Sequence, residues 1–279
     1  MRNEGEYFND ERNGKGKEYD YDGTIKYEGE YLNGQRNGKG KEYYINRKLR
    51  FEGEYLNGKK WNGIGYNING NIEFKIKDGK GNIKEYNYDG ELKFEGEYLY
   101  GKRNGKGKEY NYGGILEFEG EYLNGIKNGK GKEYNYKGEL DFEGEYLNEK
   151  RNGKGKEYYN NDKLRFEGEY LNGKKWNGIG YDINGNIEFK IKDGKGYIKE
   201  YDYDGILEFE GEYLNGERNG KGKEYNYDGE FEFEGEYLNG ERNGKGKEYY
   251  NNGYLRFEGE YLNGKKWNGI GYNINGIMS

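Results

Sequence analysis

The side chains that most often carry out catalysis are nearly missing from this sequence. Its 279 residues include no His and no Cys, and its one Ser is Ser279. His, Cys and Ser supply most acid–base and nucleophilic chemistry in enzymes, so the usual catalytic constellations cannot be assembled here. The sequence therefore predicts a protein that is not an enzyme and that needs no cofactor.

Carboxylates are the remaining groups that could do chemistry, with 53 Asp and Glu residues beside 47 Lys and Arg. Paired carboxylates can cleave glycosidic bonds, but here Glu recurs next to Lys at regular intervals, which is typical of a solvated structural face. The NGKGKEY stretches lack the spacing and the hydroxyl group of a phosphate-binding P-loop. Residues 182–189, DINGNIEF, match a calcium loop poorly because the glycine is misplaced, so a turn is the better interpretation. We expect no metal site.

The composition indicates an ordered but repetitive chain. Hydrophobic residues make up 31% and charged residues 36%, which is typical of disorder, yet aromatic residues reach 18%, which is not. Basic and acidic residues alternate without forming blocks, and the net charge of -6 gives no general grip on nucleic acid. The sequence shows no signal peptide, no apolar run that could cross a bilayer and no disulfide framework, so we expect a cytoplasmic protein.

A 24-residue repeat runs through the chain. The glycine of the tripeptide GEY recurs every 24 residues, except for two gaps of 43 that each contain a shortened repeat. We therefore predict that residues 1–279 form one continuous array of about twelve repeats, with shortened repeats at 74–93 and 189–208. A longer period of 115 residues relates 51–93 to 166–208, which differ at only five of 43 positions. Such near-identity indicates recent tandem duplication.

Each repeat has the pattern of a β-hairpin. In residues 94–117, Phe94 and Tyr98 alternate with glutamates, which is typical of a half-exposed strand, and a second alternating stretch follows a turn rich in Gly and Asn. DG, GG or NG pairs then lead into the next repeat, as in tight hairpin loops. A strand glycine leaves space that an aromatic ring can cover, so we expect Phe94 or Tyr98 to lie over Gly105 and Gly107.

The charged residues of the hairpin are expected on the opposite face. There Glu95 and Glu97 can meet Lys106 and Lys108, which would form a ladder of opposite charges along the sheet. The place of Tyr110 is open. Strict alternation puts it with the lysines, whereas a bulge or a three-residue loop would bring it to the aromatic face.

These residues resemble a known family. The stretch YEGEYLNGQRNGKGKEY, residues 27–43, is similar to the MORN repeat, roughly aromatic-x-Gly-x-aromatic-x-x-Gly-Lys-x-x-Gly-x-Gly, in its 24-residue variant form. Tyr replaces the usual second Trp, and Asn replaces the His that often precedes the last glycines. The resemblance covers essentially the whole chain and implies an all-β fold, an elongated single-layer antiparallel β-meander of stacked hairpins. It also implies a role as a scaffold, a dimerisation module or a targeting module, and membrane-lipid binding has been proposed for several members.

The aromatic residues form the candidate interaction surface. Packing against neighbouring rings is the plainer role for any one Tyr, but a single-layer sheet has no second layer, and a long aromatic stripe would leave apolar surface that ordinarily marks an interface. The stretch FEGEYLNGKKWNGIGY occurs three times, and its glycine spacing predicts one residue inserted in the turn, which would project each Trp from one edge. The shortened repeats are expected to change the local twist of the sheet. The candidates are Tyr31, Tyr55, Tyr98, Tyr122, Tyr146, Tyr170, Tyr213, Tyr237, Trp61, Trp176 and Trp267.

Three accounts of function remain open. The leading hypothesis is a non-enzymatic scaffold that binds a protein partner, or itself as a homo-oligomer, through its aromatic face and its uncapped terminal strands. The alternative is an adaptor that binds anionic membrane lipid, supported by Lys pairs such as Lys39 and Lys41 and opposed by the glutamates beside them. In that case the cytoplasmic protein would be peripheral to a membrane or to the cytoskeleton. The third is an array left by repeat expansion without a function.

Overall fold

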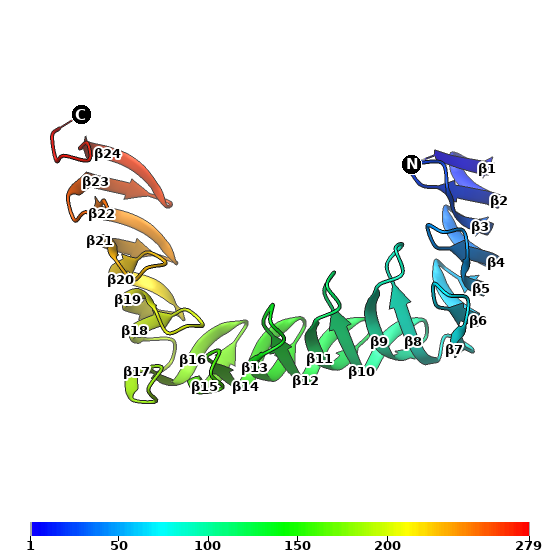
Figure 1. Cartoon of the computed structure of the whole chain (residues 1–279), viewed down its shortest axis with the longest axis horizontal. Helices are drawn as coiled ribbons and strands as arrows, with labels where there is room; N and C mark the ends of the chain where they lie inside the picture. Colours follow the sequence, from blue (N-terminus) through cyan, green and yellow to red (C-terminus); the bar gives the residue numbers. More distant parts are fainter. Residues whose placement is uncertain (1, 279) are drawn as a thin grey trace. The chain divides into compact units, whose positions relative to one another are not determined.

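The 24-residue repeats fold as β-hairpins, as their alternating pattern predicts (Figure 1). The structure is a computed structural model that describes residues 2–278, except for the side chain of Arg2. Its secondary structure is β, and no helix in this described range could span a bilayer. The chain divides into two units, Met1–Gly138 (unit 1) and Glu139–Ser279 (unit 2). Each unit is described by itself, and the expectation of one continuous array stays a prediction.

Each unit contains twelve strands within the described residues. In unit 1 they are β1 (Arg2–Phe8), β2 (Glu11–Tyr19), β3 (Ile25–Leu32), β4 (Gln35–Tyr43), β5 (Leu49–Leu56), β6 (Lys59–Tyr66), β7 (Ile72–Ile76), β8 (Gly81–Tyr86), β9 (Leu92–Leu99), β10 (Lys102–Tyr110), β11 (Leu116–Leu123) and β12 (Ile126–Tyr134). In unit 2 they are β13 (Leu140–Leu147), β14 (Lys150–Tyr158), β15 (Leu164–Leu171), β16 (Lys174–Tyr181), β17 (Ile187–Ile191), β18 (Gly196–Tyr201), β19 (Leu207–Leu214), β20 (Glu217–Tyr225), β21 (Phe231–Leu238), β22 (Glu241–Tyr249), β23 (Leu255–Leu262) and β24 (Lys265–Gly271).

The strands pair in chain order, which makes each unit a single-layer antiparallel meander. In unit 1, β1 to β7 form one ladder and β8 to β12 another; in unit 2, β13 to β17 and β18 to β24 do the same. Between β7 and β8 only the isolated bridge Lys77↔Lys80 is formed, and between β17 and β18 only Lys192↔Lys195. The shortened repeats therefore change the sheet locally by ending one ladder and starting the next.

The register of the hairpins is set by glycines. In β3 and β4, Gly29 lies opposite Gly40, and the turn at Asn33 and Gly34 has positive φ at both residues, 49° and 74°, as a two-residue hairpin loop requires. A bulge follows in β4, where Gly38 has φ of 94° and the Glu30 carboxylate accepts a hydrogen bond from the Lys39 N–H at 3.1 Å. This arrangement recurs in the other full-length repeats that lack Trp and fixes which side chains share a face.

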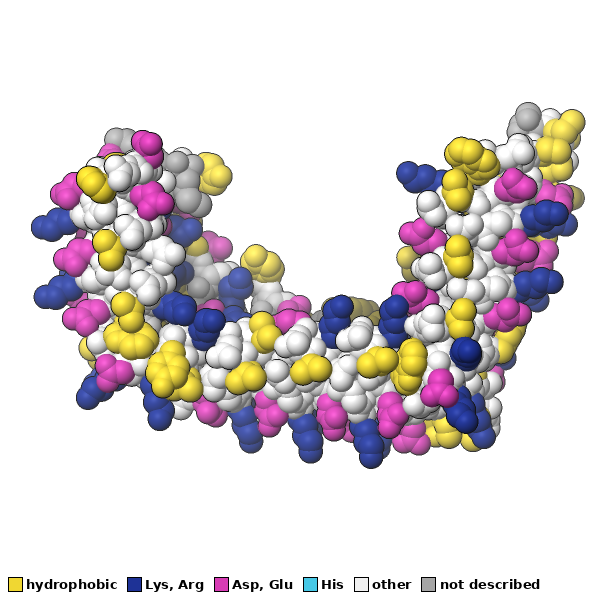
Figure 2. All heavy atoms as spheres, turned by 180° about the vertical axis from the view of Figure 1, so that it is seen from behind, with side chains coloured by type: hydrophobic (Ala, Val, Ile, Leu, Met, Phe, Trp, Pro, Cys, Tyr) yellow, Lys and Arg dark blue, Asp and Glu magenta, His cyan; other side chains and the backbone are white. Residues whose placement is uncertain are grey.

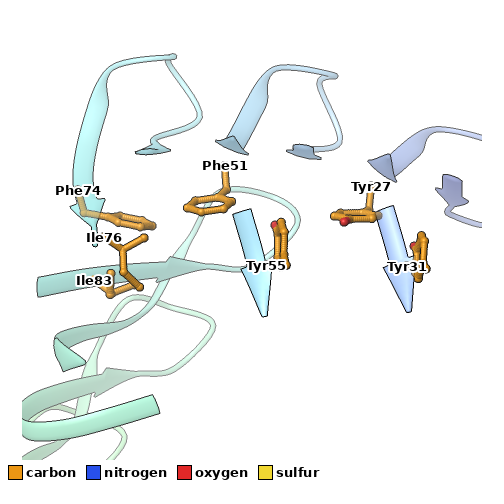
Figure 3. Close-up of a cluster of buried hydrophobic side chains, with 7 residues drawn as sticks. All are labelled: Tyr27, Tyr31, Phe51, Tyr55, Phe74, Ile76 and Ile83. Carbon is orange, nitrogen blue, oxygen red and sulfur yellow. The ribbon is translucent and has the colours of Figure 1, made fainter. Parts of the chain in front are cut away.

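Aromatic rings lie over the glycines and form the core (Figure 3). A Cβ placed on Gly107 would lie 2.5 Å from Cζ of Phe94, so this ring covers the glycine as predicted. Tyr98 does not cover Gly105, because the Glu97 carboxylate occupies that space. On the core face of β4 and β5, Glu42 lies opposite Phe51. A glutamate of the KEY motif therefore enters the aromatic face, whereas the lysine before it points to the other face.

The position of Tyr110 is settled by its hydrogen bond. The register shifts between Glu109 and Tyr110, which agrees with the bulge considered from the sequence. The hydroxyl group of Tyr110 nevertheless donates to Glu95 at 2.8 Å, so the tyrosine stays on the charged face. The bulge does not move its ring to the side of the phenylalanines.

Candidate interaction surface

The tyrosines predicted to form an interaction surface belong to the core. Their rings make edge-to-face contacts with the phenylalanines; Tyr122, for example, lies with its ring centre 5.4 Å from that of Phe94 and 5.7 Å from that of Phe118. Tyr98 and Tyr213 are half-buried. The buried candidates are Tyr31, Tyr55, Tyr122, Tyr146, Tyr170 and Tyr237.

The chain supplies its own cover for this aromatic face. The guanidinium of Arg36 lies 3.9 Å from the centre of the Tyr27 ring and donates hydrogen bonds to Glu18 at 2.6 Å and to Glu42 at 2.7 Å. Arginines at the corresponding places lie 4.0 Å from the phenylalanine rings beneath them, namely Arg103, Arg151, Arg218 and Arg242. The expectation of an open aromatic stripe is therefore wrong, since a ladder of cations and glutamates takes the place of a second layer.

Two sites in this ladder are deeply buried ion clusters. Glu42 contacts Arg36, Arg50 and Lys60, with N···O distances of 2.7, 3.0 and 2.9 Å. Burial alone raises the pKa of Glu42, but the charges of Lys60, Arg50 and Arg36 outweigh it and hold the pKa far below its ordinary value. These clusters hold the hairpins together and leave Glu42 without the properties of a general acid or base.

The second cluster, in unit 2, surrounds Glu157. Burial again raises its pKa, and the charges of Lys175, Arg165 and Arg151 lower it to about 2. The hydroxyl group of Tyr170 donates a hydrogen bond to the same carboxylate at 2.9 Å. Glu157 is therefore a structural anion.

The three tryptophans lie in strands. Trp61 in β6 and Trp176 in β16 are half-buried, and each packs against the tight turn of the shortened repeat that follows. The Gly79 N–H donates to the Trp61 carbonyl at 2.8 Å, and a Cβ on Gly79 would lie 2.8 Å from Cζ3 of Trp61. Trp267 in β24 is 71% exposed.

The residue insertion predicted for the Trp repeats is wrong. In an ordinary repeat, Gly40 lies opposite Gly29. In the Trp repeat, Gly63 lies opposite Gly53, so Gly63 corresponds to Gly40 and not to Gly38, as the predicted insertion requires. The segment between the turn and this glycine contains the additional Trp but lacks the Gly–Lys pair of the usual bulge. It is therefore one residue shorter than in an ordinary repeat, residues 59–62 against 35–39. Glycine spacing alone could not show this, because both alignments place an Asn–Gly pair near the bulge.

The opposite face carries the expected charge ladder in part. The second lysine of most GKGK motifs meets a glutamate across the strands, as in Lys41 with Glu52 at 3.2 Å and Lys108 with Glu119 at 3.7 Å. The second glutamate of the FEGEY motif instead accepts from a backbone N–H at the bulge, as Glu121 does from Lys130 at 2.9 Å. Figure 2 shows basic and acidic side chains interleaved over the surface of both units.

This arrangement leaves the first lysine of the motif without an ion pair among the described residues. Because the bulge amide engages the neighbouring glutamate, the ammonium group has no fixed carboxylate partner. The residues concerned are Lys15, Lys39, Lys106, Lys130, Lys154, Lys221 and Lys245.

A shallow groove crosses the strands on the charged face. In unit 1 its floor is the backbone of Gly5, Gly16, Gly29, Gly40 and Gly53, and it encloses about 720 Å³. The residues on either side of each glycine form the walls, which alternate between Lys and Glu from one strand to the next. The two walls are two residues apart, roughly 7 Å, which admits an extended peptide but not a helix about 10 Å across.

Unit 2 has the same groove. It encloses about 610 Å³ over Gly222, Gly235, Gly246 and Gly259, and its walls include the unpaired Lys221. The recurrence shows that the groove is a property of the repeat. It was missed at the sequence level because the Lys and Glu side chains of this face were considered only as ion pairs, and not as the two walls of a space between them.

The halves of the chain also differ in charge, which the even alternation of signs conceals. Residues 24–138 contain 22 basic and 17 acidic residues, whereas the corresponding residues 139–253 contain 18 and 27. Four positions reverse sign, always from basic to acidic: Lys26/Asp141, Arg47/Asp162, Lys93/Glu208 and Lys102/Glu217. Aligning the two copies over their whole length would have shown this.

Exposed aromatic rings occur at the turns between hairpins. They are far more accessible than the tyrosines of the core, with Tyr21 at 87%, Tyr112 at 79%, Tyr136 at 71% and Tyr227 at 88% exposure. The sequence signal is the second Tyr of the EYxY stretch, which falls in the turn and not in the strand.

The other chemistry considered from sequence is structural. The carboxylate of Asp182 accepts hydrogen bonds from the backbone N–H groups of Asn184 at 2.9 Å and Asn186 at 2.8 Å, so the calcium-like stretch is a turn. Across residues 2–278 no group of three or more Asp or Glu side chains is arranged to hold a metal ion.

Comparisons with known proteins identify the repeat. A sequence model described as MORN repeat matches seven segments that together cover more than half of the chain, residues 4–25, 27–47, 94–114, 118–139, 142–163, 209–231 and 233–253. All three tryptophans lie outside these segments. No curated protein sequence matches the chain.

Solved structures give only remote likenesses. The crystal structure of TcdB2-TccC3 shares 10% identity at a TM-score of 0.23 and is matched over 92% of this chain and 15% of that chain. The structure of TcdB2-TccC3-TEV shares 11% at a TM-score of 0.16, over 93% and 16%. The chain thus spans less than a fifth of those proteins, and likenesses this weak carry no argument.

Proposed function

Because the chain belongs to the MORN-repeat family, whose repeats are interaction modules and not catalytic ones, we propose that it is a non-enzymatic scaffold that binds a protein partner or a second copy of itself. The observation that carries the proposal is the glycine-floored groove, present with the same chemistry in both units. The aromatic face is already covered by arginine and glutamate. The groove is therefore the better candidate for the contact.

The lysines without ion pairs indicate what the partner presents. Lys15 and Lys39 stand in the wall of the unit 1 groove, and Lys221 and Lys245 in that of unit 2. A partner segment that lies extended in the groove with acidic side chains toward these lysines would gain new ion pairs without breaking existing ones.

The proposal is tested by neutralising these lysines. The variant with Lys15, Lys39, Lys221 and Lys245 all changed to Gln should fold, since none makes an ion pair and Gln places no second carboxylate opposite the glutamates across the strands. It should lose partners captured from the source cell or self-association measured by light scattering. The matched control changes the exposed turn lysines Lys77 and Lys192 to Gln and should retain the captured partners or the self-association. Equal binding by both variants would remove the groove from consideration.

Binding to anionic lipid is the second candidate. The excess of basic over acidic residues in 24–138 favours it, and the acidic excess in 139–253 opposes it. Co-sedimentation of the full chain with vesicles containing acidic lipids at low salt distinguishes the two. Membrane binding predicts salt-sensitive recovery with the vesicles, and the protein-scaffold proposal predicts that the chain stays in the supernatant.

A further inference from the structure

A cavity lies on the core face of unit 1, where the ladder that ends at β7 meets the ladder that begins at β8. It encloses about 310 Å³. Its apolar lining includes Tyr98 together with Phe74, Ile76 and Ile83, which Figure 3 shows grouped at one end of the core cluster. This volume is at the lower end of the range for small-molecule sites, so the cavity suits a ligand with one ring or a short chain.

Three of the five charged side chains in the lining already have partners. The pairs are Arg50 with Glu42 at 3.0 Å, Lys84 with Glu73 at 3.1 Å, and Glu85 with Arg103 at 3.1 Å. The charge of Glu85, the one acidic residue of the lining, is therefore balanced by an arginine. The remaining two charged residues are Lys59 and Lys60, and they decide what the cavity attracts.

Lys60 lacks one of the two glutamates that a cation of the core face usually bridges. It takes the position of Arg36 in an ordinary repeat and pairs with Glu42 at 2.9 Å. Gly65 stands where the second glutamate would be, and the Phe74 ring that lies over this glycine carries no charge. Burial lowers the pKa of Lys60, so a second anion beside its ammonium group would stabilise the charged form.

Lys59 has no ion pair within residues 2–278, whereas its counterpart in unit 2 has one. The backbone surroundings match, because a Cβ on Gly101 would lie 2.9 Å from Cβ of Lys59, and the corresponding Cβ in unit 2 would lie 2.8 Å from that of Lys174. In unit 2 the next residue is Glu217, which binds Lys174 at 2.6 Å. In unit 1 the same position is Lys102. Unit 2 thus shows a carboxylate bound at this lysine, and unit 1 supplies a second cation instead.

We propose that this cavity binds a small organic carboxylate, with its apolar body against Phe74, Ile76 and Ile83 and its carboxylate toward Lys59 and Lys60. The ligand would supply the anion that Glu217 supplies in unit 2. Its lining comes from both ladders, which are otherwise joined only by an isolated bridge among the described residues, so a bound ligand would tie the two together. The site uses none of the groove lysines and goes beyond the proposed scaffold function.

Titration of the full chain with phenylacetate, followed by ligand-observed NMR at pH 7, tests the proposal. Phenylacetamide is the neutral analogue, and acetate carries the charge without the ring. Phenylacetate should bind with a Kd of about 1 mM or below, and the other two should bind roughly tenfold more weakly or less, because each lacks one of the two interactions. Equal binding of phenylacetate and phenylacetamide would overturn the proposal, and so would phenylacetate binding that does not saturate.

Two variants test the site itself. Lys102→Glu gives unit 1 the carboxylate that Glu217 provides in unit 2, so it should pair with Lys59 and weaken phenylacetate binding roughly tenfold. Lys59→Gln removes the cation and should have the same effect. The matched control Arg47→Asp makes the same sign reversal at an exposed turn residue outside the lining, and it should leave the Kd unchanged.

The variants are chosen to keep the fold. Lys102→Glu and Arg47→Asp each introduce the residue that unit 2 has at the corresponding place, and Arg47 and Asp162 share a positive φ, 64° and 60°. Thermal unfolding verifies that each variant folds. The variant with four groove lysines changed to Gln should bind phenylacetate like wild type, which separates this site from the scaffold contact. Wild-type affinity in both Lys102→Glu and Lys59→Gln, or affinity lost in the groove variant, would overturn the proposal.

Discussion

Arg36 lies with its guanidinium 3.9 Å above the ring of Tyr27 and bridges Glu18 of the preceding hairpin to Glu42 of its own. This contact explains how a sheet of one layer keeps an aromatic core out of water. The guanidinium of Arg36 covers the Tyr27 ring, and its N–H groups donate hydrogen bonds that join two repeats.

Removing this cation should destabilise the hairpins beside it. Arg36→Met keeps a long side chain but leaves Glu18 and the buried Glu42 with one partner fewer, and we expect it to lower the free energy of unfolding by about 2–4 kcal/mol in denaturant titration. Arg36→Lys should cost less than half of that, because Lys127 naturally lies 4.0 Å from the Phe118 ring at the corresponding place.

The exposed Arg47 provides the control, since Arg47→Met should change stability by no more than about 0.5 kcal/mol. If Arg36→Met cost no more than this control, the arginine would not be serving as cover for the core.

The stability of unit 2 should depend on pH through Glu157. Its pKa is lowered from 4.5 to about 2, so folding favours the ionised form. The resulting stability is fully present above pH 4.5 and is lost as the pH falls toward 2, and it amounts to about 3 kcal/mol.

Glu157→Gln separates this effect from general acid unfolding. The variant should be less stable than wild type at pH 7, and the difference should shrink as the pH falls through this window, measured by denaturant titration at each pH. A difference that stays constant from pH 7 to pH 2 would show that the ionisation of Glu157 does not matter.

Local patterns were sufficient to predict the hairpins. The alternation of aromatic and charged residues and the glycines of the turns act within a few residues, and they correctly place Phe94 over Gly107 and a turn at Tyr100 and Gly101. The cover of the core could not be predicted in this way. Arg36 and Glu18 are eighteen positions apart and meet only because consecutive hairpins stack.

The burial of the candidate tyrosines could not be predicted for the same reason. Tyr31 and its equivalents have the composition of an interface, but whether a ring is exposed depends on what the next repeat places over it. The turn tyrosines, such as Tyr112, have no following element to cover them. The groove follows from a property that a list of side chains does not contain, namely the gap between the rows of Lys and Glu side chains on either side of Gly16 and Gly40.

Tyr27 should be replaceable by Phe without loss. Its hydroxyl group is buried with no hydrogen-bond partner among the described residues, and burial raises its pKa to about 12. Tyr27→Phe is therefore expected to leave stability unchanged or raise it by up to about 1 kcal/mol, whereas Phe142→Tyr, the reverse change at the corresponding place, should cost about 1–3 kcal/mol. Equal and opposite small effects would instead indicate that water reaches the hydroxyl group in both places.

The fluorescence of each tryptophan should reflect the packing of its own side chain. In variants that keep one Trp and carry Phe at the other two positions, Trp267 should emit at long wavelength and be readily quenched by acrylamide, because it is 71% exposed. Trp61 and Trp176 should be shielded, since each packs on a turn glycine, Gly79 and Gly194. Gly79→Ala places a methyl group 2.8 Å from the Trp61 ring at a residue with φ of 68°, so it should displace the ring and increase its quenching. The same substitution at Gly194 should leave Trp61 unchanged and affect Trp176 alone. Quenching of Trp61 that is insensitive to Gly79→Ala would contradict the packing of this ring against the shortened repeat.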